Sequence, residues 1–519
     1  MKIIDIKNIK DYIKDGDMLA ISGSGGSGSC EAILKGIMNS YLDSGHPKNI
    51  GVTCGISPGN LTTDDVGMNM LAKPGLVAKA ICAHLGMGKV FGLSVGNNQF
   101  PAFAVPLGVI NHLYRAIAGG EIGVLTHIGL NTFADPRIDG CRANEKAKEL
   151  PNIVELVKID NQELLLYKSF KIDVAIIKAT YADEDGNLSL EHEVVIGEQY
   201  NMAIAAHNSG GIVIAQVEKI VPRHSLKARN VLVHSSYVDY VVVSPPDTSL
   251  GDYNMPIYRP EATGDSRINI TNNAVIPLTA RKVCSRRAAL ELKKGNVINL
   301  GVGIPEIVGK IAEEEGFSEE IYLSVETGPT GGIPIGGVAF GGAINADSII
   351  PTAEQFDAYN GGALDMAILG LAEVDKDGNV NVSKFGSRVT GPGGFINITQ
   401  STSKIIFVGT FTTNNLKEQF NDGKIAIEHE GEKQKFVDKV EQITFSGKQA
   451  LKNGQEVYYV TERCVFKLED KGPTLIEIAP GINLETDIIN QMGFLPNISS
   501  ELKEMDERIF KDQKMDLQI

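Results

Sequence analysis

Cysteines are few in this sequence, and long apolar runs are absent. The six cysteines are scattered, with no CxxC pair and no spacing of metal ligands: Cys30, Cys54, Cys82, Cys141, Cys284 and Cys464. In a chain of 519 residues, this pattern is typical of reduced cysteines in a cytosolic protein. No apolar run approaches the roughly 18 residues of a membrane span, and the polar N-terminus lacks the apolar core of a signal peptide. We therefore expect a soluble, cytoplasmic protein with no membrane contact.

Positive charge is also scarce. The chain has 49 lysines and arginines against 64 aspartates and glutamates, a formal net charge of -15. Nucleic-acid-binding proteins usually need a basic face, so the charge argues against that class. An anionic small ligand is still compatible, because it needs only a local basic patch or a helix N-terminus. The nine histidines form no metal-ligand pattern, so we expect no metal.

Glycine, by contrast, is abundant. The 56 glycines show no triplet period, so they indicate tight turns and close backbone approaches. Short apolar runs alternate with helical spacing: Leu19–Ser22 precedes Cys30–Tyr41, and Val297–Leu300 precedes Pro305–Glu315. Buried parallel strands flanked by helices explain this order, so the predicted fold class is α/β.

An internal repeat suggests two related halves. Residues 172–188 read IDVAIIKATYADEDGNL and residues 364–380 read LDMAILGLAEVDKDGNV, with seven of seventeen positions identical. Each copy predicts one long buried strand ending in a D-x-D-G-N turn, after which a returning strand should follow. Strand plus Asp-Gly turn is a common combination, but seven identities in register favour duplication over convergence.

We therefore predict two tandem related α/β domains, residues 1–275 and 276–519. The openings of the two halves match in kind, since Gly16–Ile21 and Gly295–Leu300 both precede a glycine-rich turn and a helix. The proline-rich, polar segment from Ser244 to about Asn273 is typical of a linker, assigned here to the first domain. The charged tail from Glu501 suggests a solvated helix.

A dinucleotide-binding motif occurs near the start of the chain. Gly23, Gly25 and Gly28 form G-x-G-x-x-G between a strand and a helix, which by itself indicates an NAD enzyme. The acidic residue expected about 20 positions later is missing, because Asp43 comes early and in a loop-like context. An ordinary glycine-rich turn is the favoured interpretation.

The candidate chemistry is concentrated around Glu326. This carboxylate follows the apolar run Ile321–Leu323, and five of the next eleven residues are glycine. Ligands bind at strand ends in α/β sheets, and glycines there let a large ligand approach the backbone. A carboxylate can be a covalent nucleophile, and with a normal pKa it would be ionised at neutral pH without a partner base. Most glutamates cap a helix or pair with a lysine, but the glycine run beside Glu326 favours a functional role for this one.

A second glycine cluster, residues 390–395, reads TGPGGF. Backbone N–H groups in such a loop could hold a developing oxyanion or a phosphate. A plain surface loop is an equally good interpretation of the residues alone.

Together these segments resemble the single-chain family I coenzyme A transferases, which include propionate and acetate CoA-transferases. The resemblance covers nearly the whole chain. It is carried by GVGIPE, the Glu326 segment, LGLAEVDKDGNVNVSKFG, GPGGFINITQ, residues 460–466, TFADPR at 132–137, and IKATYADEDGNLSLEHE. It implies an α/β fold of two related domains, transfer of CoA between short carboxylic acids, no cofactor beyond coenzyme A as substrate, and a homo-oligomer, tetramer or dimer.

The resemblance also implies roles for individual residues. Glu326 matches the nucleophile that attacks the acyl-CoA thioester and then carries CoA as a glutamyl thioester, which gives ping-pong kinetics. Gly394, beside Gly393, matches the loop whose amide stabilises the oxyanion and contacts CoA. The turn of Gly301, Val302, Gly303, Ile304 and Pro305 matches a CoA-contacting turn. Asn379 matches a CoA-side asparagine, although its place in the D-G-N turn also has a structural explanation.

One departure from the family pattern lies in the predicted acyl pocket. Leu107-Gly108 stands where the related enzymes commonly carry Gln-Gly, whose glutamine can donate to the carbonyl oxygen of the acyl group. Leu107 cannot donate. Either another donor substitutes, or the preferred acids differ and have an apolar body.

Three other functions stay open at this point. Water entering a glutamyl thioester would make the enzyme an acyl-CoA hydrolase. A ligand sensor could keep the fold, although it would not need Glu326. A nicotinamide-dependent oxidoreductase is supported only by the G-x-G-x-x-G turn.

Overall fold

The computed structural model describes residues 1–59, 65–244, 258–269, 276–336 and 341–519, and these form two compact units. Unit 1 comprises residues 1–268, 325–357 and 383–397; unit 2 comprises residues 269–324, 358–382 and 398–519. The predicted domain boundary at 275/276 stays a prediction. Most of the predicted linker (245–257 and 270–275) and Gly337 of the glycine run lie outside the described residues.

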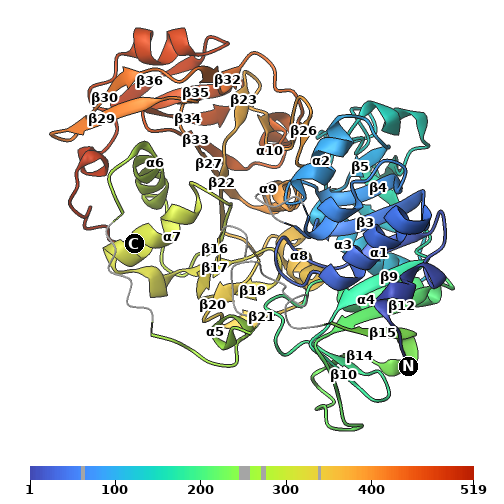
Figure 1. Cartoon of the computed structure of the whole chain (residues 1–519). Helices are drawn as coiled ribbons and strands as arrows, with labels where there is room; N and C mark the ends of the chain where they lie inside the picture. The colour runs from blue at the N-terminus through green and yellow to red at the C-terminus, as the bar shows by residue number, and fades with distance from the viewer. Residues whose placement is uncertain (60–64, 245–257, 270–275, 337–340) are drawn as a thin grey trace. The chain divides into compact units, whose positions relative to one another are not determined.

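Unit 1 is built on an eight-stranded sheet in which every neighbouring pair is parallel (Figure 1). In spatial order the strands are β1 (Lys2–Ile3), β15 (Tyr240–Val243), β12 (Ile212–Val217), β9 (Val174–Lys178), β2 (Met18–Ile21), β3 (Ile50–Ile56), β4 (Val77–His84) and β5 (Ala102–Ala104). Every position of the central strands β2, β3 and β9 is buried, and nearly all of their residues are apolar, as expected for parallel strands covered on both faces.

Helices cover this sheet, and smaller sheets flank it. The helices are α1 (Glu31–Ser44), α2 (Lys89–Gly96), α3 (Leu107–Ala118) and α4 (Gln199–Asn208), whereas the short α5 (Pro260–Thr263) packs on β20 (Ala343–Ile344). The smaller sheets contain β13 (Lys219–Val221), β10 (Tyr181–Asp183), β11 (Leu188–Ser189) and β14 (Val231–Val233), and separately β6 (Gly123–Thr126), β8 (Gln162–Lys168) and β7 (Val154–Ile159). Helices α3 and α4 pack on each other, and α3 also packs on β3 and β4, so the start of α3 is firmly positioned.

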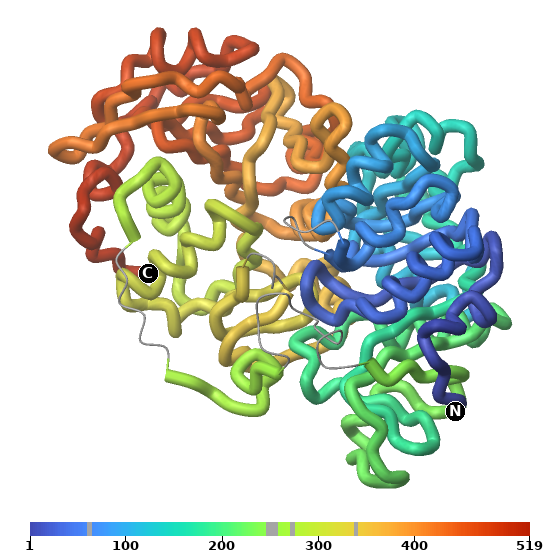
Figure 2. Tube along the Cα trace, in the orientation of Figure 1, coloured from blue at the N-terminus to red at the C-terminus, as the bar shows by residue number. Residues whose placement is uncertain are grey.

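Unit 2 has a mixed sheet with parallel strands at its centre. The strands run β17 (Tyr322–Ser324), β16 (Val297–Leu300), β22 (Met366–Gly370), β27 (Lys404–Val408), β33 (Glu456–Val460), β34 (Cys464–Glu469), β35 (Gly472–Ile478) and β36 (Asn497–Glu504). Its core packs this sheet against α6 (Ala280–Ala289) and α7 (Glu306–Glu315) through residues such as Val283, Ile311 and Ile368. Figure 2 traces the chain, with the β29–β30 hairpin (Lys417–Asn421 and Lys424–His429) in orange.

The two sheets share a strand order, which supports the predicted duplication. Strands β3-β2-β9-β12 of unit 1 occur in the same order as β17-β16-β22-β27 of unit 2. The repeat places β9 and β22 at equivalent positions. In both copies an aspartate caps the turn: Asp183 Oδ1 accepts from the amides of residues 185–187, and Asp375 Oδ1 accepts from those of Asp377 and Asn379.

The prediction of one long strand in each repeat copy was wrong. The first copy breaks after Lys178, so that β9 belongs to the large sheet and β10 to a small one, where β11 returns antiparallel to β10. The second copy breaks likewise between β22 and β23 (Glu373–Asp375), which pairs with β24 (Val380–Asn381). A continuous apolar run does not reveal where a chain leaves one sheet for another.

Two further predicted elements occur in the structure, and the predicted helical tail differs from it. The glycine-rich motif at residues 23–28 is a turn between β2 and α1, as favoured, and β16 occupies the predicted Val297–Leu300. The tail after Glu501 is not the predicted solvated helix: its first residues complete strand β36 beside β35, and a short 3-10 helix, Glu507–Phe510, then buries Ile509 and Phe510. Charged residues suit this edge strand as well as they suit a solvated helix.

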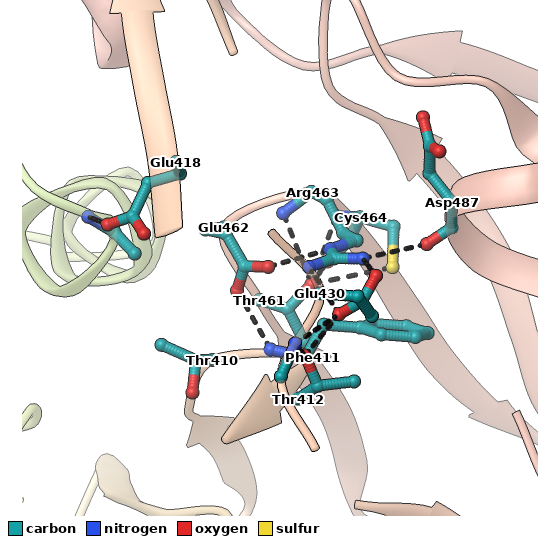
Figure 3. A network of polar contacts seen from close by, with 12 residues as sticks. Thr410, Phe411, Thr412, Glu418, Glu430, Thr461, Glu462, Arg463, Cys464 and Asp487 are labelled. Atoms are coloured by element: carbon teal, nitrogen blue, oxygen red, sulfur yellow. Dashed lines mark hydrogen bonds and ion pairs between the residues drawn. The ribbon is translucent and has the colours of Figure 1, made fainter. Parts of the chain in front are cut away.

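An ion network centred on Arg463 joins the turn between β33 and β34 to the residue after β30 and to the segment of residues 484–488 (Figure 3). The fully buried Arg463 donates to Glu462 at 2.7 Å, to Glu430 at 2.8 and 3.2 Å, and to the carbonyl of Asp487 at 2.9 Å. Its guanidinium also lies 4.9 Å from the ring centroid of Phe411. Burial of a charge is costly unless it is paired and hydrogen-bonded, and here the guanidinium makes four hydrogen bonds, three of them to carboxylates.

We predict that Arg463→Met unfolds the protein at markedly lower urea concentration. Methionine fills similar volume but leaves Glu462, which is also fully buried, without its counter-charge. Removing one partner of a buried pair typically costs about 3–5 kcal/mol. Lys148→Met, which breaks an exposed pair with Glu145, is the control and should cost less than about 1 kcal/mol. Equal urea midpoints for the two variants would contradict this role of the network.

Candidate active site

Glu326 lies on a tight turn directly after β17. The amide of Val325 donates to the carbonyl of Pro329 at 2.8 Å, and the amide of Gly328 donates to the carbonyl of Val325 at 3.0 Å. Gly328 has φ +130°, and a Cβ there would overlap the carbonyl oxygen of Ile350. Only glycine fits this position, so the turn holds Glu326 at the strand end where the sequence predicted it.

The surroundings of Glu326 change its ionisation. The side chain keeps a small accessible surface, but burial of its carboxyl group raises the pKa to about 7, while a hydrogen bond from the Gly394 amide lowers it. The expectation of a normal carboxyl pKa was therefore wrong, because a short sequence does not show how deeply a group is buried. A more basic carboxylate is a better nucleophile once ionised, and at neutral pH both forms are present.

Gly394 is in direct contact with this carboxylate. A Cβ at residue 394 would overlap Glu326 Oε2 and come within 3.1 Å of the Phe356 ring, so the contact requires glycine. The glycines of residues 391, 393 and 394 are buried. The interpretation of the TGPGGF segment as a plain surface loop was wrong, because the loop is buried and its Gly394 amide donates to the Glu326 carboxyl group; a role in holding a developing oxyanion stays a prediction.

The start of α3 holds this loop in place. The Leu107 amide donates to the carbonyl of Gly393 at 2.9 Å, and the Gly108 amide donates to Asn397 Oδ1 at 3.1 Å. A Cβ at Gly108 would collide with the Phe356 ring, so this glycine lets α3 approach closely. The predicted residues Leu107, Gly108, Gly393 and Gly394 thus meet around Glu326 within unit 1.

The CoA-contacting residues predicted in unit 2 lie in two turns of the chain. Residues 301–305 form the turn between β16 and α7, and Val302 is 57% exposed, so the turn is open to a ligand. The Asn379 side chain donates to Asp375 at 3.1 Å and accepts from the amide of Gly447 at 3.1 Å. The turn thus uses both ends of this side chain, in line with the structural explanation, and the CoA contact stays a prediction.

Sequence reasoning missed two cavities in unit 1. The first, about 10 Å³, is lined by Leu107, Glu198, Thr327 and residues of the glycine-rich turn. The second, about 320 Å³, is lined by Gly86, Lys89, Gly92, Leu93, Arg388, Val389 and Thr390, so it adjoins the TGPGGF loop and carries two cationic side chains. The sequence did not indicate Phe356 or Glu198, because neither belongs to a motif. Folding brings Phe356 close to Gly394 and brings Glu198 close to Leu107.

The described residues contain neither a candidate metal centre nor a helix that could cross a membrane. Among residues 1–59, 65–244, 258–269, 276–336 and 341–519, no three or more His, Cys, Asp or Glu side chains gather as a metal ion would require. Within the same described residues, no helix combines the length and apolar character needed to cross a bilayer.

Comparisons with known proteins agree with this geometry. The family model described as "Coenzyme A transferase" matches residues 5–244. The chain is 44% identical over 517 residues to the caffeate CoA-transferase of Acetobacterium woodii, covering 99% of this chain and 98% of that protein. It is 42% identical over 516 residues to the acetate CoA-transferase YdiF of Escherichia coli K12, covering 99% and 96%.

A solved structure is equally similar. The acyl-CoA transferase YdiF of E. coli O157:H7, in a thioester complex with CoA, superposes with a TM-score of 0.93 at 39% identity, covering 100% of this chain and 98% of that chain. The chain belongs to the coenzyme A transferase family. As a CoA-transferase it moves CoA from an acyl-CoA to a carboxylate, and the expected α/β fold is confirmed.

The buried carboxyl of this CoA-transferase gives its stability a pH dependence of defined sign. The folded pKa of Glu326 is raised from 4.5 to about 7, so between these values the folded chain holds a proton that the unfolded chain has released. Stability therefore falls as the pH rises through this window. We predict that Glu326→Gln, which stays neutral, is inactive but about 1–3 kcal/mol more stable than the native enzyme above about pH 7.

Thermal unfolding of both proteins at low and high pH measures this difference, which should vanish as the pH approaches the ordinary carboxyl pKa. Glu319→Gln, at an exposed glutamate, is the matched control and should show no pH-dependent gain. A Glu326→Gln enzyme that is less stable than the native one at alkaline pH would contradict the buried, uncompensated carboxylate.

We also predict that Gly394→Ala folds but loses at least about a hundredfold in kcat. The added methyl group must displace the Glu326 carboxylate from the amide that binds it, and displacements near 1 Å can cost about this much. Steady-state kinetics measures the loss. Gly119→Ala, where a Cβ meets only ordinary contacts, is the control and should retain native turnover. Native kcat in Gly394→Ala would show that the close contact is not needed.

Proposed function

We propose that the enzyme moves CoA from a short-chain acyl-CoA to a free short carboxylate, such as acetate, propionate or butyrate, through a glutamyl-CoA thioester on Glu326. The observation that carries this proposal is the direct contact between the buried Glu326 carboxylate and the Gly394 amide. The thioester complex of the similar E. coli enzyme supports it further.

The first half-reaction exchanges one thioester for another. A carboxylate oxygen of Glu326 attacks the thioester carbonyl, and collapse of the tetrahedral oxyanion expels CoA thiolate and leaves a mixed anhydride. The thiolate then attacks the glutamyl carbonyl, so that the donor acid leaves as a carboxylate and Glu326 holds CoA. The acceptor carboxylate runs the same steps in reverse. No ATP is needed, because a thioester bond is conserved throughout.

The residues around Glu326 have defined parts in these steps. The Gly394 amide, which hydrogen-bonds the resting carboxylate, is placed to bind oxyanions that form on the same atoms. The raised pKa supplies a more basic nucleophile, at the cost that part of the enzyme is protonated at neutral pH. Residues 301–305, Asn379 and Gly393 are proposed to contact CoA, and Leu107 with Gly108 to line the acyl pocket.

We further propose that the protein works in the cytoplasm as a homo-oligomer, dimer or tetramer, with no cofactor other than its substrate coenzyme A, and that residues 1–275 and 276–519 are its two domains. All six cysteines are buried and unpaired, which supports a reducing compartment and leaves acyl transfer through cysteine without an accessible thiol.

Incubation with acyl-CoA and no acceptor tests the covalent step. The mass of the intact protein should rise by one CoA per subunit, hydroxylamine should convert residue 326 to a hydroxamate, and two-substrate kinetics should be ping-pong. Glu326→Gln is the control and should gain no mass. Intersecting double-reciprocal lines without an adduct would instead indicate direct transfer in a ternary complex, and steady release of free CoA without acceptor would indicate a hydrolase.

A further inference from the structure

The small cavity of unit 1 gathers polar atoms that have no partner. The side chains of Ser24, Ser27, Glu198 and Gln199 line it and are at least nine-tenths buried. Among the described residues, none provides a hydrogen bond to Ser24 Oγ, Ser27 Oγ, Glu198 Oε1 or Gln199 Oε1. Leaving a buried polar atom unpaired typically costs about 1–3 kcal/mol, so several such atoms at one cavity point to a ligand that binds there.

The position of the cavity connects it to the transferase site. Thr327, which follows Glu326 directly, is part of its wall, and so is Leu107. Leu107 and Glu198 both pack against Gly55 of β3. A Cβ built at Gly55 would be 3.0 Å from Leu107 Cδ1 and 3.3 Å from Glu198 Oε1, so the two side chains lie close to each other. The carboxyl group of Glu198 is thus beside the residue that replaces the family's glutamine.

The size of the cavity limits what can bind. Its volume of about 10 Å³ is about the least that admits a single water molecule. One oxygen atom of a substrate fits this space, whereas a whole acyl chain does not. The hydroxyls of the two serines and a carboxylic acid can all donate to such an oxygen.

We propose that Glu198 binds an oxygen of the acyl group or acceptor acid in this cavity and, with Ser24 and Ser27, supplies the hydrogen-bond donor that Leu107 lacks. The proposal rests on the proposed function, because it concerns the acid that reacts with Glu326. It makes Glu198 a determinant of acid binding, while CoA itself is bound elsewhere.

The ionisation of Glu198 agrees with a donor role. Burial raises the pKa of this carboxyl group to about 8, with smaller opposing effects from the backbone amides of Gly55 and of Glu198 itself. The titratable groups that face it are Cys54 of β3 and Tyr114 of α3, whose own pKa values are raised by burial and other neighbours, so both stay neutral. Among the described residues that line the cavity, no other side chain is charged. At neutral pH, Glu198 is therefore mostly protonated and has an O–H to donate.

Replacement of Glu198 by glutamine and by leucine separates binding from packing. Glu198→Gln keeps a donor at every pH and should retain kcat/KM for the acid within about threefold. Glu198→Leu removes the donor at similar volume and should lower it about tenfold to hundredfold, the usual effect of losing one hydrogen bond to a substrate. Affinity for free CoA should be unchanged in both variants.

Melting temperature distinguishes this role from a structural one. Because Glu198 Oε1 has no partner among the described residues, Glu198→Leu should melt at or above the native temperature while activity falls. A structural role predicts the opposite, a lower melting temperature and an unchanged ranking of acids. Ser27→Ala should weaken acid binding, and Ser40→Ala, at a buried serine that does not line the cavity, is its control.

Two further readouts complete the test. The double variant Glu198→Leu, Leu107→Gln should regain activity relative to Glu198→Leu, since the amide of glutamine replaces the lost donor. In the native enzyme kcat/KM should fall as the pH rises above about 8, and in Glu198→Gln this decline should be absent. If the native enzyme forms the glutamyl-CoA adduct but Glu198→Leu retains native kcat/KM, the cavity holds only a structural water and the inference is overturned. Absence of the adduct in the native enzyme would instead refute the proposed function.

Discussion

The contact between the Glu326 carboxylate and the Gly394 amide is the constraint on which the site depends. It requires glycine at residue 394, because any side chain would overlap the carboxylate, and it requires the start of α3 to hold the loop through Leu107 and Gly108. Burial around this contact disfavours the ionised carboxylate. The single amide offsets only part of that penalty, so the enzyme keeps a basic nucleophile in place of a stable ion pair.

In unit 2, the buried charges around Arg463 are paired and stabilise the fold, in contrast to the carboxyl groups of the site. Arg463 and Glu462 are buried, Glu430 is partly exposed, and both carboxylates are hydrogen-bonded to the guanidinium. Among the described residues, no cation pairs with Glu326 or Glu198 of unit 1, and their raised pKa values come first from burial. Buried carboxyl groups without a cation are a common mark of a functional site, because evolution otherwise pairs or removes them.

The sequence predicted what local chemistry determines. The alternation of apolar runs and helical spacing located β16 and α7, and the D-x-D-G-N repeat located two hairpin turns whose aspartates cap them identically. Glu326 was found because glycines follow a strand end. Burial was not predictable in this way, because it depends on segments distant in the chain: Glu198 meets Leu107 from 91 residues away, and Gly394 meets Glu326 from 68 residues away. The apolar runs likewise concealed where β9 ends and β10 begins, since leaving a sheet depends on tertiary contacts.

The central claim is that a Glu326 oxygen enters and leaves the transferred acids, and isotope transfer measures this most directly. When an acceptor acid labelled with oxygen-18 at both carboxyl oxygens attacks the glutamyl thioester, one labelled oxygen must stay on the carboxyl group of residue 326 after acyl-CoA departs. The account predicts oxygen-18 in the peptide that contains Glu326 after turnover, and in the donor acid released from later turnovers. An unlabelled Glu326 after many turnovers would contradict it.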